Sequence, residues 1–188
     1  MATVAIPPWN GSGVLPPINS TAPTSADRSP YTVSLSDFVL RFGTSAQRRQ
    51  ILNGFLQYRK LLHTAGLTIG FQWIDGSFME NVETLEARNP NDLDVVTFFN
   101  LPVGLTQQQV ATNVPELMDR PYLKANYFVD AFVVSLGSQA VSLVERSAYW
   151  YSIWSHRKDS TWKGFLQIDL DPIDDALAAL NLQAGGPP

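Results

Sequence analysis

Apolar residues recur along the chain with two kinds of spacing. One spacing is typical of strands and the other is typical of helices. Four segments rich in β-branched and aromatic residues predict strands, at residues 67–74, 92–99, 127–134 and 163–170. Helical spacing predicts a long helix that opens near Ser45 and ends at Gly66, and further helices over residues 77–88, 139–158 and 173–180. We therefore expect an α+β fold in which helices flank a small mixed sheet.

The first thirty residues lack both patterns. They contain six of the thirteen prolines, set among Gly, Ser, Thr and Asn, which disfavours regular structure. We predict an extended Pro-rich arm at residues 1–30, one domain at residues 31–183 and a flexible tail at residues 184–188. Apolar residues such as Trp9 and Leu15 favour docking of the arm on the domain, and free disorder is the alternative.

The amino-acid composition limits the kinds of ligand and metal site that the protein can have. A net charge of -4 argues against a protein that coats nucleic acid by charge alone, although a local basic patch stays possible. The chain has no cysteine and two histidines, which excludes a thiolate or His-rich zinc site and leaves hard cations with oxygen ligands. It contains no apolar run as long as a membrane span and no signal-peptide pattern at its start, so we expect a cytoplasmic protein without a membrane partner.

Candidate chemistry begins where the first predicted strand ends in Gly76 and Ser77. Small residues at such a turn allow backbone N–H groups to approach a phosphate. After fourteen intervening residues, Asp92 and Asp94 flank a leucine at the start of the second strand. Side chains two apart on a strand share a face, and two adjacent carboxylates are costly unless a cation lies between them.

Asp130 is the one acidic residue in the third predicted strand. It either reaches water at the end of the strand or lies beside Asp92 and Asp94 as a third carboxylate, and we favour the second reading. Glu80 has two readings of equal weight. It is an additional metal ligand, or it favours the start of the predicted helix through the dipole.

The order of these motifs resembles the DNA polymerase β-type nucleotidyltransferase superfamily: a strand, Gly-Ser, a helix, Asp-x-Asp on a strand, and one Asp on a later strand. More closely, the chain is similar to uncharacterised bacterial nucleotidyltransferase-like proteins that share the Pro-rich start, Gly-Ser-Phe-x-Glu and Pro-Asn-Asp-x-Asp-Val-Val. The resemblance implies a nucleotidyltransferase-like sheet in which Gly76 and Ser77 hold the triphosphate. It further implies that Asp92 and Asp94 bind Mg²⁺, and that Asp130 completes a two-metal site and helps to deprotonate the attacking hydroxyl.

The implied function is Mg²⁺-dependent transfer of a nucleotide from an NTP to a hydroxyl of RNA, protein or a small molecule, within a toxin–antitoxin or phage-defence system as for many relatives. Two departures motivate an alternative. The segment between Ser77 and Asp92 is long and acidic, and Phe78-Met79-Glu80 stands where small antitoxin-type enzymes have an arginine. The alternative is a catalytically degenerate module of the same fold that binds a nucleotide or a partner protein. A structural or assembly role for the Pro-rich arm is a third hypothesis.

Residues 150–163 are rich in both aromatic and basic side chains. Trp154 and Trp162 offer faces on which a base could stack, next to Arg157 and Lys158. Ordinary packing of the aromatic side chains in the core is the simpler explanation, and we prefer it.

Overall fold

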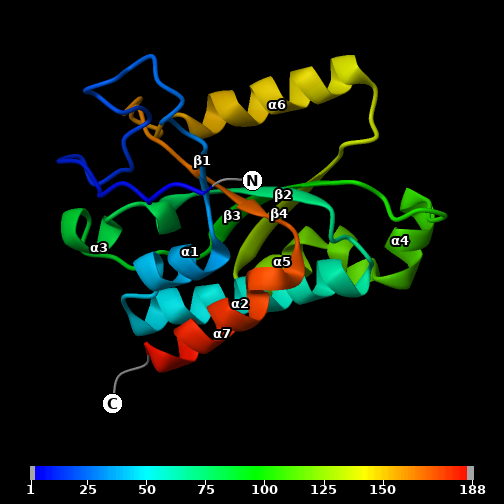
Figure 1. The fold of residues 1–188 in the computed structure, drawn as a ribbon. Coiled ribbons are helices and arrows are strands. Elements are labelled where there is room, and N and C mark those ends of the chain that lie inside the picture. The colour runs from blue at the N-terminus through cyan, green and yellow to red at the C-terminus, as the bar shows by residue number, and fades with distance from the viewer. Residues whose placement is uncertain (1–2, 186–188) are drawn as a thin grey trace.

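The computed structural model of the protein describes residues 3–185. This part of the chain forms one five-stranded mixed sheet in the order β1-β5-β2-β3-β4. Helices cover both faces: α6 lies over one face, and α1, α2, α5 and α7 lie over the other (Figure 1). The predicted α+β class is confirmed.

All four predicted strands are present, with their ends shifted by at most three residues, and a short fifth strand precedes them. The strands are β1 (Tyr31–Val33), β2 (Gly70–Asp75), β3 (Leu93–Phe99), β4 (Val129–Ser135) and β5 (Leu166–Asp169). Strand β2 is antiparallel to both β3 and β5, whereas β3 and β4 are parallel, as are β1 and β5. Three residues are too few for a periodic signal, which explains why the sequence did not predict β1.

Seven α-helices lie within residues 3–185. They are α1 (Leu35–Phe42), α2 (Ala46–Thr64), α3 (Val82–Leu85), α4 (Gln107–Asn113), α5 (Arg120–Tyr127), α6 (Ala140–Trp154) and α7 (Asp175–Ala184). Helix α2 begins where the sequence predicted, because the Ser45 side chain accepts a hydrogen bond from the backbone N–H of Arg48. Helix α5 was not predicted. Pro121 lies in the first turn of α5, where proline costs no hydrogen bond.

The prediction of one helix over residues 77–88 is wrong. The chain instead forms a 3-10 turn at Ser77–Met79 and the four-residue helix α3, separated by Glu80 in an extended conformation. Arg48 explains the break. Its guanidinium donates to the backbone carbonyls of Phe78 (2.6 Å) and Glu80 (2.7 Å), which would otherwise accept helical hydrogen bonds.

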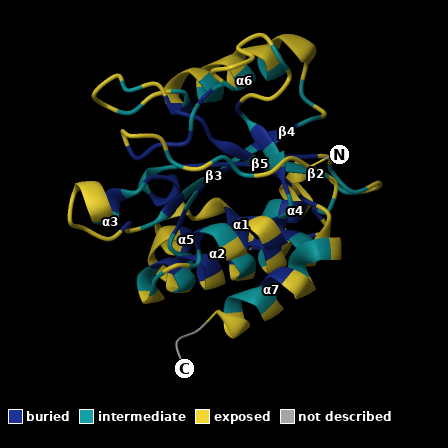
Figure 2. Ribbon diagram, turned by 60° about the vertical axis from the view of Figure 1, so that its left-hand side comes forward, coloured by how far each residue is buried: buried dark blue, intermediate teal, exposed yellow. Residues whose placement is uncertain are grey.

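Two apolar cores lie on opposite faces of the sheet (Figure 2). The larger core joins the sheet to α1 and α2, with Phe38 and Phe55 fully buried. The smaller core lies under α6 and contains Trp73, Phe98 and Trp154. Trp154 is thus a core residue, as expected from the simpler reading of residues 150–163, whereas Trp162 is 51% exposed.

Residues 3–30 contain neither a helix nor a multi-residue strand, and they dock on the rest of the chain. The indole N–H of Trp9 donates to the Met79 carbonyl at 2.7 Å, and the Leu15 carbonyl accepts from the Gly164 N–H at 2.7 Å. Leu15 is 1% exposed and belongs to the larger core. The boundary at residue 30 stays a prediction, and residues 1–2 of the predicted arm and 186–188 of the predicted tail lie outside the described residues.

Close packing between α2 and the end of α5 depends on Gly54. A Cβ atom at this position would lie 2.0 Å from the carbonyl oxygen of Tyr127 and 2.7 Å from its carbonyl carbon. We expect Gly54→Ala to lower the free energy of unfolding by about 1–3 kcal/mol, because neither backbone can move without displacing a helix. Urea unfolding measures this change. The matched control, Asn53→Ala on the exposed side of the same helix, is expected to change stability by less than about 0.7 kcal/mol. Equal stability of the two variants would contradict the prediction.

Candidate functional site

Three aspartates lie in one row across the sheet. Asp75 on β2 is the register partner of Asp94 on β3, and Asp94 is the register partner of Asp130 on β4. Directly opposed residues share a face of a sheet, so the three side chains lie on the same side. The predicted proximity of Asp94 and Asp130 is confirmed. Asp92, which precedes β3, lies near the same row, since its charge acts on Asp94.

Helix α5 supplies cations to two of the predicted aspartates. The Nζ atom of Lys124 lies 2.5 Å from Oδ2 of Asp92 and 3.5 Å from Oδ2 of Asp130. Arg120 contacts the other oxygen of Asp130 at 2.6 Å. A lysine ammonium thus lies between Asp92 and Asp130, and its hydrogen bond to Asp92 raises the pKa of Lys124. Within residues 3–185, no group of three or more Asp, Glu or His side chains has the arrangement of a metal site.

Asp94 has no such partner. No hydrogen bond or ion pair joins its carboxylate to another side chain in the described part of the chain. Burial, followed by the charges of Asp92 and Asp130, raises the pKa of Asp94 to about 6. Gly76 gives this carboxylate room, because a Cβ atom at Gly76 would lie 2.2 Å from Oδ2 of Asp94. The glycine also has a φ of 92°, which other residues rarely adopt.

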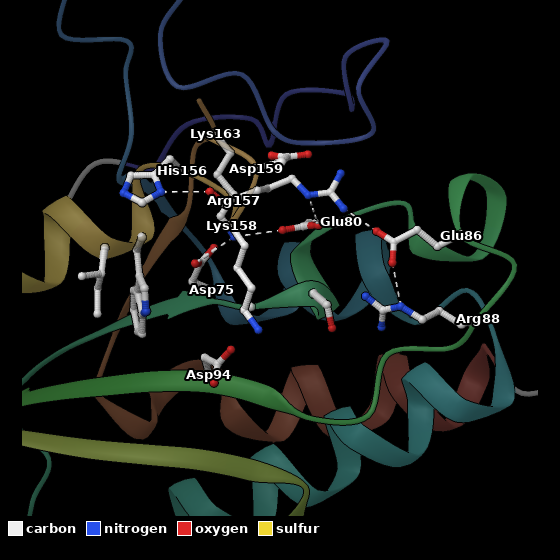
Figure 3. Close-up of a pocket in the computed structure, with 14 residues that line it drawn as sticks. Asp75, Glu80, Glu86, Arg88, Asp94, His156, Arg157, Lys158, Asp159 and Lys163 are labelled. Atoms are coloured by element: carbon white, nitrogen blue, oxygen red, sulfur yellow. Dashed lines mark hydrogen bonds and ion pairs between the residues drawn. The ribbon is translucent and has the colours of Figure 1, made fainter. Parts of the chain in front are cut away.

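A cleft of about 560 Å³ opens above these residues (Figure 3). Three of the predicted site residues, Gly76, Ser77 and Asp94, line it, whereas Asp92 and Asp130 are absent from its lining. The opposite wall comes from the end of α6 and the segment that follows, including Arg157, Lys158 and Lys163. Sequence analysis had noted these basic residues without assigning them to the same site as the aspartates.

Asp75 is a site residue that sequence analysis missed. It is 3% exposed, and its Oδ2 atom lies 2.9 Å from Nζ of Lys163. The other oxygen, Oδ1, is buried without a hydrogen-bond partner among residues 3–185. Burial raises the pKa of Asp75 to about 7, because the cost of burying the charge exceeds the attraction of Lys163. The signal in the sequence was an acid at the end of an apolar strand, directly before Gly-Ser.

Glu80 closes the side of the cleft as a buried counter-ion. Lys163 contacts one of its carboxylate oxygens at 3.0 Å, and Arg157 contacts the other at 3.1 Å. Burial alone would lower the pKa of Lys163, but Asp75 and Glu80 together outweigh it and raise that pKa. The dipole explanation for Glu80 is wrong, since Glu80 follows a three-residue 3-10 turn and begins no helix.

The rim of the cleft carries further charge. Arg157 also contacts Glu86, which in turn accepts a hydrogen bond from Arg88 at 2.7 Å. Lys158 is exposed, extends into the cleft in Figure 3, and has no ion pair with any residue between 3 and 185. The site thus combines the carboxylate of Asp94, which has no ion pair among residues 3–185, and the partly paired Asp75 with basic side chains on the facing wall, an arrangement suited to a ligand with both anionic and cationic parts.

Comparison with known proteins gives one match. The model of a family of unknown function, DUF6932, matches residues 7–169. No curated protein and no solved structure matches the chain. Among residues 3–185, no helix combines the length and the apolar character needed to cross a bilayer.

Proposed function

Since the chain belongs to the DUF6932 family, whose function is unknown, we propose a function from its site: a cytoplasmic, Mg²⁺-dependent nucleotidyltransferase that moves a nucleotide from an NTP to a hydroxyl acceptor. One observation carries the proposal. Asp94 and Asp130 are register partners on parallel strands, and Asp94 lies against Gly76 where β2 enters the cleft. This is the convergence of acids beside a small-residue turn that the resemblance requires.

The donor atoms suit magnesium, which prefers carboxylate oxygens and keeps several waters. Asp94 is free of partners among the described side chains, and Asp92 and Asp130 lie beside it. Their present partners, Lys124 and Arg120, are 54% and 51% exposed, so each can turn into water and release its carboxylate. When bound, the cation would supply charge neutralisation for the attacking and leaving oxygens of the phosphoryl group.

The facing wall suits a triphosphate. Lys158 has a free ammonium group at the cleft, and Arg157 and Arg88 present guanidinium groups at its rim. Such groups form charge-assisted hydrogen bonds with phosphate oxygens. Ser77 adds a hydroxyl at the turn. The contribution of a helix dipole to phosphate binding is small here, because the turn after Gly76 has only three residues.

The test is transfer of label from each α-labelled NTP to material in a bacterial extract, with Mg²⁺ present. We expect Asp94→Asn to reduce transfer at least ~100-fold, because the variant removes a carboxylate that would hold the Mg²⁺ ion. The matched control is Asp159→Asn. Asp159 is exposed at the rim of the same cleft, so its variant is expected to retain full activity. Absence of transfer by the wild-type protein, or equal transfer by Asp94→Asn, would refute the proposal.

A second candidate is a nucleotide-binding module without chemistry. The ammonium of Lys124 between Asp92 and Asp130 favours it, because a built-in cation replaces the one that catalysis needs. Calorimetry with each NTP and Mg²⁺ separates the two functions. Binding without turnover supports the module, whereas turnover supports the enzyme.

A further inference from the structure

Asp75 is an incompletely paired carboxylate in the cleft. Its side chain is 4% exposed, Lys163 holds Oδ2 at 2.9 Å, and Oδ1 has no hydrogen-bond partner in the described part of the chain. A buried polar oxygen left unpaired costs free energy, and native proteins seldom retain one without a reason. A ligand that donates to Oδ1, or coordinates it, would remove this cost.

The nearest candidate for sharing such a ligand is Asp94. As register partners on antiparallel strands, the two residues have Cβ atoms about 5 Å apart on one face of the sheet. The Asp94 carboxylate also lies over Gly76, the residue that follows Asp75, since a Cβ atom there would be 2.2 Å from Oδ2. Both residues line the cleft. Two neighbouring carboxylates with unpaired oxygens thus line one cavity, and the unpaired oxygen of Asp75 is buried.

The remaining acids near the cleft differ from this pair. Asp92 and Asp130 are paired with Lys124, and both oxygens of Glu80 are paired with Lys163 and Arg157. Their negative charges are compensated by side chains of the protein itself. Among the acids of the cleft lining that are not exposed, within residues 3–185, only Asp75 and Asp94 lack full compensation, whereas Asp159 is exposed to water at the rim.

We propose that Asp75 and Asp94 together bind a divalent cation at the cleft, with Asp75 Oδ1 as a direct ligand and water or phosphate oxygens completing the coordination. The inference rests on the proposed function, because it assigns a ligand of the same magnesium site. It adds a residue outside the Asp92, Asp94 and Asp130 set. Two carboxylates are enough for Mg²⁺, which is commonly held by one or two of them together with substrate phosphates and waters.

Lys163 has a positioning role in this arrangement. Its Nζ atom contacts Asp75 Oδ2 at 2.9 Å and Glu80 at 3.0 Å, so it fixes the carboxylate plane of Asp75 and leaves Oδ1 available. Partners of ligating carboxylates orient them in this way in metal sites generally. The negative charge of Glu80 offsets that of the ammonium, which limits the repulsion between Lys163 and a bound cation.

Mn²⁺ binding tests the proposal without any need for activity. Titration of the full chain with Mn²⁺, followed by the electron paramagnetic resonance signal of the free ion, gives the affinity. We expect Asp75→Asn and Asp94→Asn each to weaken binding at least ~10-fold, since loss of a supporting contact alone costs ~10–100-fold. Asp159→Asn is the matched control. It removes an exposed carboxylate at the rim of the same cleft, and it is expected to keep Mn²⁺ affinity within ~3-fold of wild type.

Two results would overturn the inference: unchanged Mn²⁺ affinity in Asp75→Asn, or no Mn²⁺ binding by the wild type. If Asp75→Asn binds normally and Asp92→Asn does not, the cation belongs to Asp92, Asp94 and Asp130, and the proposed function stands without Asp75. Nucleotide transfer in the extract assay is scored separately, so failure of one proposal is distinguishable from failure of the other. If Asp75→Asn does not fold, an anomalous Mn peak in wild-type crystals decides: at coordination distance from Asp75 it supports the proposal, elsewhere it refutes it.

Discussion

Replacing Arg48 with methionine is expected to lower the free energy of unfolding by about 3–5 kcal/mol. The Arg48 side chain is fully buried on α2 and contacts both carboxylate oxygens of Glu83, at 2.5 and 2.8 Å. It also donates to the carbonyls of Phe78 and Glu80. Methionine fills much of the volume but leaves these acceptors without donors inside the protein. Urea unfolding followed by circular dichroism measures the loss.

Arg49→Met is the matched control for this variant. Arg49 is the next residue on α2 and is half-buried, with a single hydrogen bond of 3.2 Å to the Gly43 carbonyl. We expect it to cost less than about 1.5 kcal/mol. Similar losses for the two variants would show that the guanidinium of Arg48 has no special role in holding the wall of the cleft.

Stability should depend on pH through Asp75. Its pKa is about 7 in the folded protein and about 3.9 in an unfolded chain, so the folded state binds more protons between these values. The protonated Asp75 side chain is accommodated in the fold at no electrostatic cost, so its contribution to stability is fully present below about pH 4. That contribution is lost as the pH rises through 7 and the buried side chain becomes charged. The free energy of unfolding of Asp75→Asn, minus that of wild type, is expected to rise by about 4 kcal/mol from pH 4 to pH 8.

Urea unfolding of both proteins at several pH values gives this difference directly, and subtraction removes the titration of all other groups that the two proteins share. Ser77→Ala is the control, because it alters the same cleft without removing an ionisable group. Its difference from wild type should stay constant with pH. A constant difference for Asp75→Asn would mean that Asp75 titrates as it does in water.

Local sequence signals predicted the elements that depend on local physics. Strands β2, β3 and β4 follow from composition, and two-residue spacing placed Asp92 and Asp94 on one face. The segment after Ser77 was predicted wrongly because a distant residue decides its conformation. Arg48, thirty residues earlier in the chain, donates a hydrogen bond to the carbonyl of Phe78. Helix propensity describes only local preferences and therefore does not include this contact.

In the candidate site, too, local sequence signals predicted some features, and contacts between distant residues determined the others. The three predicted aspartates come together, but their counter-ions lie on α5, a helix that the sequence did not predict, so Lys124 was not anticipated. Asp75 was missed because burial and the position of Lys163 give it its properties, and both arise only from the tertiary fold. Residue types and spacing thus located the acids, whereas their state of pairing required the packed structure.

The pairing of β1 with β5 sets the order in which the chain can fold during synthesis. Tyr31 pairs with Leu166, and Leu15 accepts its hydrogen bond from Gly164, so the first segment waits for partners about 135 residues later. At about 5–20 residues per second, the ribosome needs on the order of 10 s to deliver them. During that interval the Leu15 carbonyl and strand β1 lack their partners, Gly164 and β5, which makes the nascent N-terminal segment a natural target for chaperones.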